Sequence, residues 1–223
     1  MNIPHPQLSG TVQARVAGEK LWLHPFRAAY WEREKTLLIA DLHLGKALHF
    51  RREGLPVPAA VSNENWDRLL ALLLDFRPQR VLLLGDLFHS EYNREWEDFC
   101  QTVEQFDQVS FELIMGNHDF LPAEAYRAAR LKIHEEQIQL GPFLLSHHPL
   151  EEVPEGLYNL AGHIHPCVFL QGSGRLRERL PCFHFGLQQG VLPAFGAFTG
   201  MAAVRPRQQD QVYVIAGEQV LEV

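Results

Sequence analysis

Short apolar runs and amphipathic segments alternate along the front half of the chain. Apolar runs bounded by charged or turn residues predict buried strands over 36–41, 80–86 and 111–119. The segments between them have the periodicity of helices, so the order β-α-β-α-β predicts parallel strands joined by crossovers. Three earlier runs predict short strands that precede this unit, over residues 11–17, 20–25 and 28–32.

The first predicted helix lies in SNENWDRLLALLLDFRP, residues 62–78. Four apolar residues follow the i, i+3, i+4, i+7 spacing that places side chains on one helix face: Trp66, Leu69, Leu70 and Leu73. Ser62 is the predicted N-cap, and the helix should end before Pro78. A second helix is predicted over 91–106 and a short third one over 122–130.

Gly and Pro divide the back half, where helical periodicity nearly disappears. The predicted strands lie within the runs 138–141, 143–149, 156–166, 167–171, 179–186, 191–196 and 211–217. They are expected to form a mostly antiparallel sheet. We therefore expect the chain, residues 1–223, to be one α/β domain of two packed sheets with helices outside.

Composition narrows the class of protein. Apolar residues make up 46% and charged residues 21% of the chain, as in ordinary globular domains. The first residues lack the order of a signal peptide, and no apolar run reaches the ~18 residues of a membrane helix, so no membrane association is expected. Three scattered cysteines without a CxxC pair favour reduced thiols in a cytoplasmic protein. The net charge of −7 disfavours a large surface for nucleic acid, but not a local site with metal ions.

Polar residues of a similar kind follow five of the predicted strands. One explanation is that each strand has ended and the side chains face water. However, ligands bind beyond the carboxyl ends of strands in open α/β sheets, so the repetition favours one shared site. The residues in question are Asp41 and His43, Asp86 and His89, Asn117, His118 and Asp119, His147 and His148, and His163 and His165.

The residue types at these strand ends indicate a metal site. Carboxylates, an amide oxygen and imidazoles are ligands of ions such as Mn, Fe or Zn, and no thiolate is among them. The D-x-H and H-x-H spacings would place residues i and i+2 of an extended segment on the same side. Gly85, Gly116 and Gly162 each precede a polar residue directly, and glycine permits tight turns and close backbone approach at a crowded site.

The order of these motifs resembles that of the calcineurin-like metallophosphoesterase superfamily. Its pattern is D-x-H, G-D, G-N-H-D/E, H and G-H-x-H, which reads here as DLH, GD, GNHD, HHP and GHIH between Asp41 and His165. The resemblance implies the two-sheet αββα sandwich of that superfamily, in agreement with the element order above. It also implies two divalent metal ions and a hydrolase that acts on phosphate esters.

The resemblance assigns the expected ligands residue by residue. His147 is preferred to His148 because members of the superfamily commonly read H-x-P there, and Pro149 sets the register; His148 stays open as the alternative. The seven ligands form one set for each ion and one shared residue: Asp41, His43 and His165 for the first ion, Asn117, His147 and His163 for the second, and Asp86 bridging both.

A finer resemblance selects a branch of the superfamily. ADLHLG, GDLFHS and GNHD look like the motifs of Mre11-type repair nucleases, although the chain stops short of their capping domain. Its length and the stretch GKALHFRREGLPVP look closest to the bacterial DNA-ligase-associated metallophosphoesterases of the PdeM type. That branch implies a manganese-dependent endonuclease acting on single-stranded DNA in repair, with Fe or Zn as alternative ions. DNA ligase and helicase repair proteins are the partners it implies.

Two histidines and a basic loop complete the expected site. Two ions would bind the phosphodiester and lower the pKa of a shared water, the nucleophile. His118 is not needed as a ligand, so we expect it to protonate the leaving oxygen or to stabilise phosphoryl charge. His89 would orient His118 or contact the phosphate, unless it is simply packed below the site. The basic loop is either solvated or bound to flanking phosphates through Lys46, His49, Arg51 and Arg52.

Two alternatives remain open at this point. The same metal site could serve a phosphodiesterase or pyrophosphatase acting on a small nucleotide, or a phosphomonoesterase, and the acidic net charge favours a small substrate. A protein with this fold could also be a non-catalytic scaffold that binds other proteins. The intact ligand set and His118 count against the scaffold.

Overall fold

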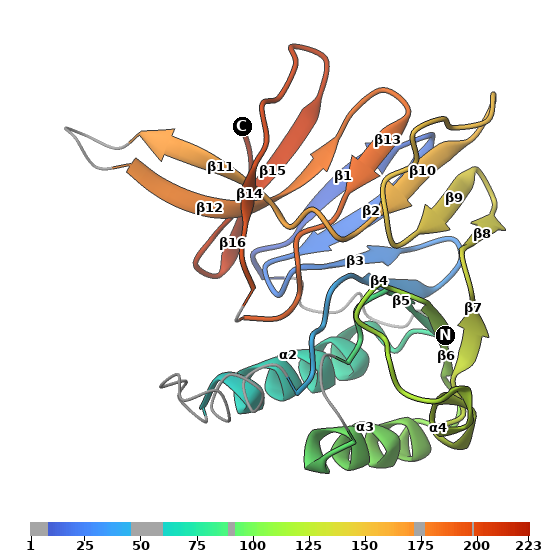
Figure 1. The fold of residues 1–223 in the computed structure, drawn as a ribbon. Helices are drawn as coiled ribbons and strands as arrows, with labels where there is room; N and C mark the ends of the chain where they lie inside the picture. Colours follow the sequence, from blue (N-terminus) through green and yellow to red (C-terminus); the bar gives the residue numbers. More distant parts are fainter. Residues whose placement is uncertain (1–8, 46–59, 89–91, 172–176, 198) are drawn as a thin grey trace, which may run out of the picture.

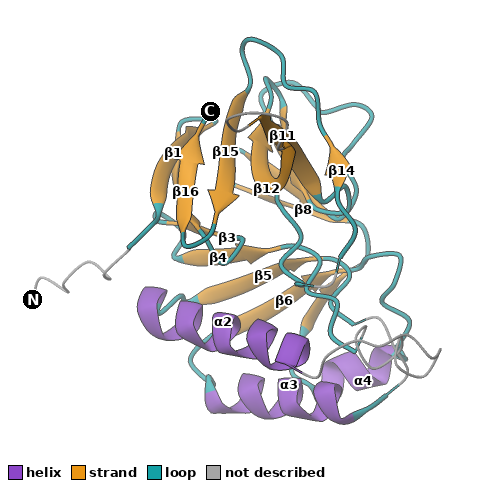
Figure 2. Cartoon of the chain, turned by 90° about the vertical axis from the view of Figure 1, so that its left-hand side faces the viewer, coloured by secondary structure: helices purple, strands orange, loops and turns teal. Residues whose placement is uncertain are grey.

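The computed structural model describes residues 9–45, 60–88, 92–171, 177–197 and 199–223. Within these residues, two β-sheets pack face to face, and three helices cover the outer face of the first sheet (Figure 1, Figure 2). The first sheet has seven strands in chain order: β1 (Val12–Val16), β2 (Glu19–His24), β3 (Ala28–Trp31), β4 (Thr36–Ile39), β5 (Arg80–Leu84), β6 (Ser110–Ile114) and β7 (Lys132–His134).

The expected β-α-β-α-β unit is confirmed. Strands β4, β5, β6 and β7 pair in parallel, whereas β1 to β4 are antiparallel neighbours. The connections of the parallel strands contain α2 (Ala60–Phe76), α3 (Arg94–Gln105) and α4 (Ala123–Ala128). All three helices lie on the same side of the first sheet (Figure 2). The parallel order places the carboxyl ends of β4, β5 and β6 at one edge of the sheet.

The second sheet is mixed. Most of its strand pairs are antiparallel, as expected, but β10 pairs in parallel with both β9 and β13, and β11 pairs in parallel with β14. The two strands that lead to His147 and His163 are therefore parallel neighbours. The strands are β8 (Gln137–Leu140), β9 (Phe143–Ser146), β10 (Tyr158–Ala161), β11 (Pro166–Gln171), β12 (Arg177–Phe185), β13 (Gln189–Val191), β14 (Ala202–Ala203), β15 (Gln211–Ala216) and β16 (Gln219–Glu222).

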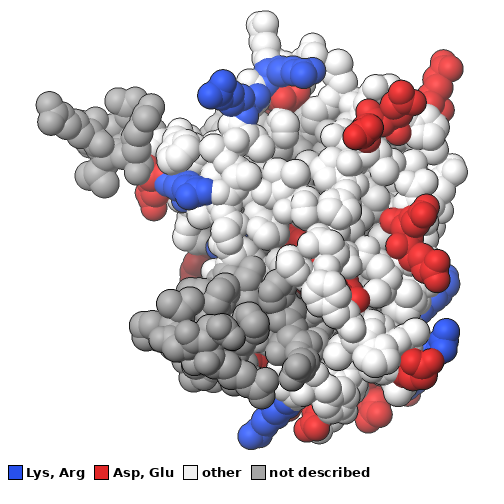
Figure 3. Space-filling view, in the orientation of Figure 1, with Lys and Arg blue, Asp and Glu red and all other residues white. Residues whose placement is uncertain are grey.

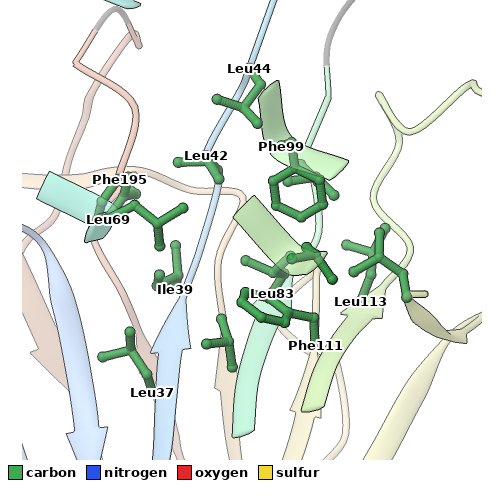
Figure 4. Close-up of a cluster of buried hydrophobic side chains, with 14 of the residues drawn as sticks. Leu37, Ile39, Leu42, Leu44, Leu69, Leu83, Phe99, Phe111, Leu113 and Phe195 are labelled. Atoms are coloured by element: carbon green, nitrogen blue, oxygen red, sulfur yellow. The ribbon is translucent and has the colours of Figure 1, made fainter. Parts of the chain in front are cut away.

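Strand β4 is apolar on both faces because both faces are covered. Successive side chains point to opposite sides of a strand. Leu37 and Ile39 therefore pack towards the helices, in a cluster with Leu69, Leu83 and other buried residues (Figure 4). Leu38 packs on the opposite face, in the cluster between the two sheets. The uninterrupted apolar run seen in the sequence thus marks a central strand.

Most predicted boundaries differ by a few residues from those in the structure, and the short strands β7, β14 and β16 were not predicted. Two of the differences concern a predicted cap and a predicted strand. Helix α2 begins at Ala60, so Ser62 lies inside the helix and is not its N-cap. Two expected strand residues, Ala194 and Phe195, lie beyond β13, which ends at Val191. The loop that carries them instead binds the end of β4, where the Phe195 N–H donates to the Ala40 carbonyl. Neither difference moves a predicted ligand.

Two structural checks bear on the class of protein. Among the described residues, no helix is both long and apolar enough to span a bilayer. Cys167 and Cys182 are buried, Cys100 is half-buried, and all three thiols are free. Burial raises the pKa of the Cys182 thiol to about 12, so this group stays protonated and unreactive.

His24, at the end of β2, makes folding sensitive to acid. Burial lowers the pKa of His24 from 6.5 to about 4, and its Nδ1 accepts the N–H of Phe26. Below pH 6.5 the unfolded chain therefore binds a proton that the folded chain rejects, and stability is lost as the pH falls from there. Between about pH 7 and about pH 4.5, this group should cost roughly 2.5 kcal/mol of unfolding free energy.

The variant His24→Asn should lack this part of the loss. Its amide oxygen can still accept the Phe26 N–H, but it does not titrate. Urea unfolding of both proteins across this pH range measures the difference. Parallel stability curves for the two proteins would show that His24 does not contribute.

Candidate metal centre

The seven expected ligands and His118 lie beyond the carboxyl ends of β4, β5, β6, β9 and β10, where the two sheets meet. The His163 N–H donates to Asp41 Oδ2 at 2.8 Å, which links the end of β10 to the end of β4. The Gly162 N–H donates to the carbonyl of His147, which links β10 to β9. Backbone hydrogen bonds thus hold segments that are far apart in sequence around one site.

Three groups of ligand atoms come together at this site. In each group the ligand atoms lie within 4.8 Å of one another. Asn117 joins them, because its Oδ1 lies 3.0 Å from His147 Nε2. The structure therefore brings all seven expected ligands into one cluster, and His148 lies beside them. The three groups are Asp41, His43 and His165; Asp41, Asp86 and His147; and His147, His148 and His163.

The spacing of the ligand atoms fits a metal site. Nitrogen and oxygen atoms bound to one ion at about 2.1 Å, at tetrahedral or octahedral angles, lie about 3.0–3.4 Å apart. His163 Nδ1 lies 3.2 Å from His147 Nε2, and His165 Nε2 lies 3.3 Å from Asp41 Oδ1. The side chains therefore already have the separations that a shared ion requires.

Asp86 lies between the two expected ligand sets. Its Oδ2 is 3.8 Å from His43 Nε2, which belongs to the first set. Its Oδ1 is 3.5 Å from His147 Nε2, which belongs to the second set. One carboxylate thus has an oxygen near each set, which is the arrangement that a bridging ligand needs.

The carboxylates of the cluster are deeply buried. Asp41 is 0% exposed and Asp86 is 2% exposed. Asp41 Oδ2 accepts the His163 N–H, but Asp41 Oδ1 has no hydrogen-bond partner. A buried carboxylate oxygen is costly unless a cation or donor compensates it, and the facing imidazole nitrogens are themselves metal ligands. The donor set therefore fits divalent ions held between Asp41, Asp86 and the histidines.

Backbone carbonyls orient two of the histidines. His147 Nδ1 lies 2.9 Å from the Leu84 carbonyl, and His165 Nδ1 lies 2.9 Å from the Gly200 carbonyl. A carbonyl can only accept, so Nδ1 carries the hydrogen in each ring and the Nε2 lone pair faces the cluster. Such second contacts fix the tautomer of metal-binding histidines.

Two further histidines are kept in the neutral form that binds metals. Burial lowers the pKa of His163, and the neighbouring imidazoles of His148 and His147 lower it further. The pKa of His148 is also lowered, by partial loss of solvent around its ring and by His147, although this side chain is exposed. Neutral imidazoles leave a lone pair for an ion without first releasing a proton.

The backbone at the ligands is left-handed, which corrects one expectation. Asp41, His43, Asp86, His163 and His165 have φ between 50° and 64°. The D-x-H and H-x-H pairs therefore do not lie on extended segments. The ligand atoms of Asp41 and His43 still come together in one group, whereas His163 and His165 belong to different groups. A left-handed conformation costs a non-glycine residue about 1–2 kcal/mol, and such strain is typically stored at functional sites.

Glycines make room for the ligand side chains, as the sequence predicted. A Cβ on Gly116 would lie 2.3 Å from Asp86 Oδ1, and one on Gly162 would lie 2.6 Å from Asp41 Oδ2. A Cβ on Gly85 would lie 2.2 Å from His147 Nδ1. The three motif glycines thus let the backbone of one strand end touch the side chain of another.

Gly85→Ala should therefore displace His147. Gly85 has φ +80°, and so does Gly156, where a Cβ would meet nothing within 4 Å. Both alanine variants are destabilised by the left-handed backbone, but only Gly85→Ala also creates a clash. The clash should lower its stability by about 1–3 kcal/mol more. Metal content and thermal melting of the two variants measure the difference. Equal melting temperatures and equal metal content would show that the contact with His147 is not tight.

The Gly116–Asp119 turn holds His118 at the site. The backbone N–H of His118 donates to Asp86 Oδ1 at 2.9 Å, and its ring lies 5.9 Å from that of His43. Asp119 is buried, and its carboxylate accepts the N–H groups of Gly116 and Phe88. Burial raises the pKa of Asp119 to about 6. The sequence analysis predicted no role for Asp119, although this residue is the last of the GNHD motif and could have been singled out there.

The structure places His147 and His148 differently. His147 is 1% exposed at the floor of the site, between Leu84, Asn117 and Asp86. His148 is exposed, and its ring centroid lies 4.0 Å from that of His163. This placement favours His147 as the ligand and leaves His148 at the rim. Five other expected site residues fall outside the described residues: Lys46, His49, Arg51, Arg52 and His89.

Comparisons with known proteins agree with the geometry. The family model described as calcineurin-like phosphoesterase matches residues 34–186. The chain is also similar to a solved structure, the nuclease MPE of Pseudomonas putida, with 30% identity and a TM-score of 0.78. That match covers 96% of this chain and 100% of the other. No curated protein matches.

Proposed function

This chain belongs to the calcineurin-like phosphoesterase family, and from that premise we propose that it is a metal-dependent phosphodiesterase that cuts DNA. The family and the similarity to a nuclease support a metal-dependent hydrolase. The proposal adds the substrate, which we take to be single-stranded DNA, and internal cleavage. Two Mn²⁺ ions are the proposed cofactors, held by the seven residues of the cluster.

The position of Asp86 carries the proposal. Its two oxygens face different ligand sets, and Oδ1 also accepts the His118 N–H. When bound, two divalent ions would act as Lewis acids on the phosphate and acidify a water molecule. The chain contributes the ligand positions and the proton donor. His147 and His165 keep their Nε2 lone pairs turned to the cluster through their carbonyl contacts.

His118 is the proposed proton donor. Its backbone is fixed by Asp86, while its ring is half-buried and lies next to the ring of His43. From this position the imidazole would give its proton to the leaving oxygen of the cleaved ester. His89 is kept as a residue that orients His118 or contacts the phosphate. Lys46, His49, Arg51 and Arg52 are kept as contacts to flanking phosphates.

A side-by-side assay tests the function. Plasmid, single-stranded DNA and bis-p-nitrophenyl phosphate are incubated with the metal-free protein and then with Mn²⁺, Mg²⁺ or Zn²⁺. We expect Mn²⁺ to support internal cleavage of single-stranded DNA and hydrolysis of the small diester. Hydrolysis of the small diester without cleavage of any DNA would reject the nuclease. No hydrolysis with any ion would favour the non-catalytic scaffold.

A small nucleotide substrate is the second candidate, favoured by charge. The chain has a net charge of −7. Among the described residues of the face in Figure 3, Asp and Glu gather along the right side, whereas Lys and Arg are few and lie near the edges. Such a face attracts long polyanions weakly. Faster turnover of dinucleotides or pyrophosphates than of DNA would support this candidate.

The cellular setting is proposed from resemblance and composition alone. The resemblance to the DNA-ligase-associated branch supports a role in DNA repair, with DNA ligase and helicase proteins as proposed partners. The free, buried thiols are in keeping with a reducing compartment, and we propose the cytoplasm.

A further inference from the structure

An exposed phenylalanine stands next to the proposed proton donor. Phe120 follows the GNHD motif directly, and 75% of its surface is exposed. Its ring lies edge to face with that of His118, with the centroids 5.9 Å apart and the planes at 90°. Isolated apolar residues on a surface are common and need no function. Phe120, however, lies at the rim of the metal cluster, where a bound substrate would reach it.

The backbone on both sides of Phe120 is fixed. Asp119 is buried and accepts two backbone N–H groups, from Gly116 and Phe88. On the other side, the Leu121 N–H donates to the hydroxyl of Tyr126, a residue that is 1% exposed. The Phe120 N–H itself donates to the His118 carbonyl at 3.1 Å. The ring is therefore presented outwards from a rigid turn.

The ring of His118 lies between Phe120 and the first ligand set. The His118 ring lies 5.9 Å from that of Phe120 and 5.9 Å from that of His43. The His43 ring in turn lies 5.5 Å from that of His165. Phe120 thus lies on the side of the site where His118 would protonate the leaving oxygen. A neighbouring nucleoside of the substrate would come within reach of its ring.

We propose that Phe120 stacks on the nucleobase of the nucleotide that carries the leaving oxygen. This inference rests on the proposed function and adds the residue that selects unpaired DNA. Stacking on an aromatic side chain needs a free face of the base, which a paired and stacked duplex does not offer. Stacking is also independent of charge and of base identity, which suits a chain whose net charge is −7. Phe120 would therefore favour single strands without reading their sequence.

Variants of Phe120 test the contact. Phe120→Ala should lower kcat/KM for single-stranded DNA on the order of tenfold, while hydrolysis of bis-p-nitrophenyl phosphate, which has no nucleobase, should fall much less. Phe120→Trp should keep DNA cleavage near the wild-type level, because it restores an aromatic face. Phe169 on β11 is also exposed, at 53%, and Phe169→Ala is the matched control. Metal content and melting temperature show whether each variant has folded.

An abasic substrate tests the stacking itself. One nucleotide of a single-stranded oligonucleotide is replaced by an abasic one, and cleavage is mapped at every phosphodiester. The wild-type protein should cut the bond next to the abasic nucleotide less, relative to the other bonds. Phe120→Ala should lose this discrimination, since it has no stacking to lose. Equal discrimination by both proteins would overturn the inference.

The outcomes separate this inference from the proposed function. If the wild-type protein cleaves DNA and Phe120→Ala cleaves it equally well, only the inference fails. If the wild-type protein hydrolyses the small diester but never cleaves DNA, the nuclease proposal fails and the inference fails with it. A loss in Phe120→Ala that extends equally to the small diester would show that Phe120 supports His118 instead.

Discussion

Asp86→Ala should abolish metal binding and hydrolysis together. Asp86 is 2% exposed, and its carboxylate oxygens lie 3.5 Å and 3.8 Å from imidazoles of the two ligand sets. Removing it deletes the shared ligand of both ions, so the protein should bind far fewer than the about two ions per chain expected of two-metal phosphoesterases. Hydrolysis of DNA and of the small diester should both fall to background.

Melting experiments give a readout that does not depend on activity. An ion that binds only the folded state stabilises it by about 2.7 kcal/mol when the ion concentration is roughly a hundred times the Kd. Mn²⁺ should therefore raise the melting temperature of the wild-type protein but not that of Asp86→Ala. The exposed Asp75, on α2, provides a control, and Asp75→Ala should respond to Mn²⁺ like the wild type.

A second variant separates metal binding from loop support. Asp86 Oδ1 also accepts the His118 N–H, and alanine would remove that contact as well. Asp86→Asn keeps an oxygen that can accept this hydrogen bond, but it loses the charge. If Asp86→Asn loses metal as Asp86→Ala does, the carboxylate acts as a ligand. If it binds both ions normally, Asp86 serves the loop and the bridging assignment is wrong.

Sequence reasoning works best for the central strands. After their first residues, Thr36 and Arg80, strands β4 and β5 are apolar because helices cover one face and the second sheet covers the other. Burial on both faces leaves an unmistakable pattern, so the strand ends, and with them the positions of Asp41 and Asp86, could be read from the sequence. The family motifs then indicated which polar residues should lie together at the site.

Local chemistry was harder to predict than topology. Ser62 has the side chain of an N-cap, but α2 begins at Ala60, because residue type alone locates a helix end only approximately. The left-handed backbone of Asp41 and His43 was not predicted either, because Asp and His adopt this conformation more often than most residues but still rarely. It is enforced by the tertiary contacts around the cluster. Reasoning from the sequence therefore predicted the right residues with the wrong local geometry.

Backbone partners of the site leave no trace in the sequence. The carbonyls of Leu84 and Gly200 orient His147 and His165, and any residue type could supply them. Asp119 is a different case, because the residue itself could be identified in the GNHD motif. Only its two backbone partners required the structure. The exposure of Phe120 likewise required the fold, because an isolated Phe after a motif is usually read as core.

His118→Ala should separate chemistry from metal binding. The contact between residue 118 and Asp86 comes from the backbone N–H, so alanine retains it. The seven expected ligands are also complete without the His118 ring. The variant should therefore bind as many ions as the wild type, and Mn²⁺ should raise its melting temperature equally. His118→Ala and Asp86→Ala thus differ in metal content although both lose DNA cleavage.

The size of the loss should depend on the leaving group. A p-nitrophenolate ion leaves without a proton, so hydrolysis of bis-p-nitrophenyl phosphate by His118→Ala should fall only modestly. DNA has an alkoxide leaving group that needs a proton, and a positioned general acid contributes ~10²–10⁴-fold in such cases. Rates on both substrates, measured under single-turnover conditions with saturating Mn²⁺, provide the comparison. If both rates fall by the same factor, the imidazole acts by stabilising charge on the phosphoryl group, and the proton must reach the leaving oxygen from another donor.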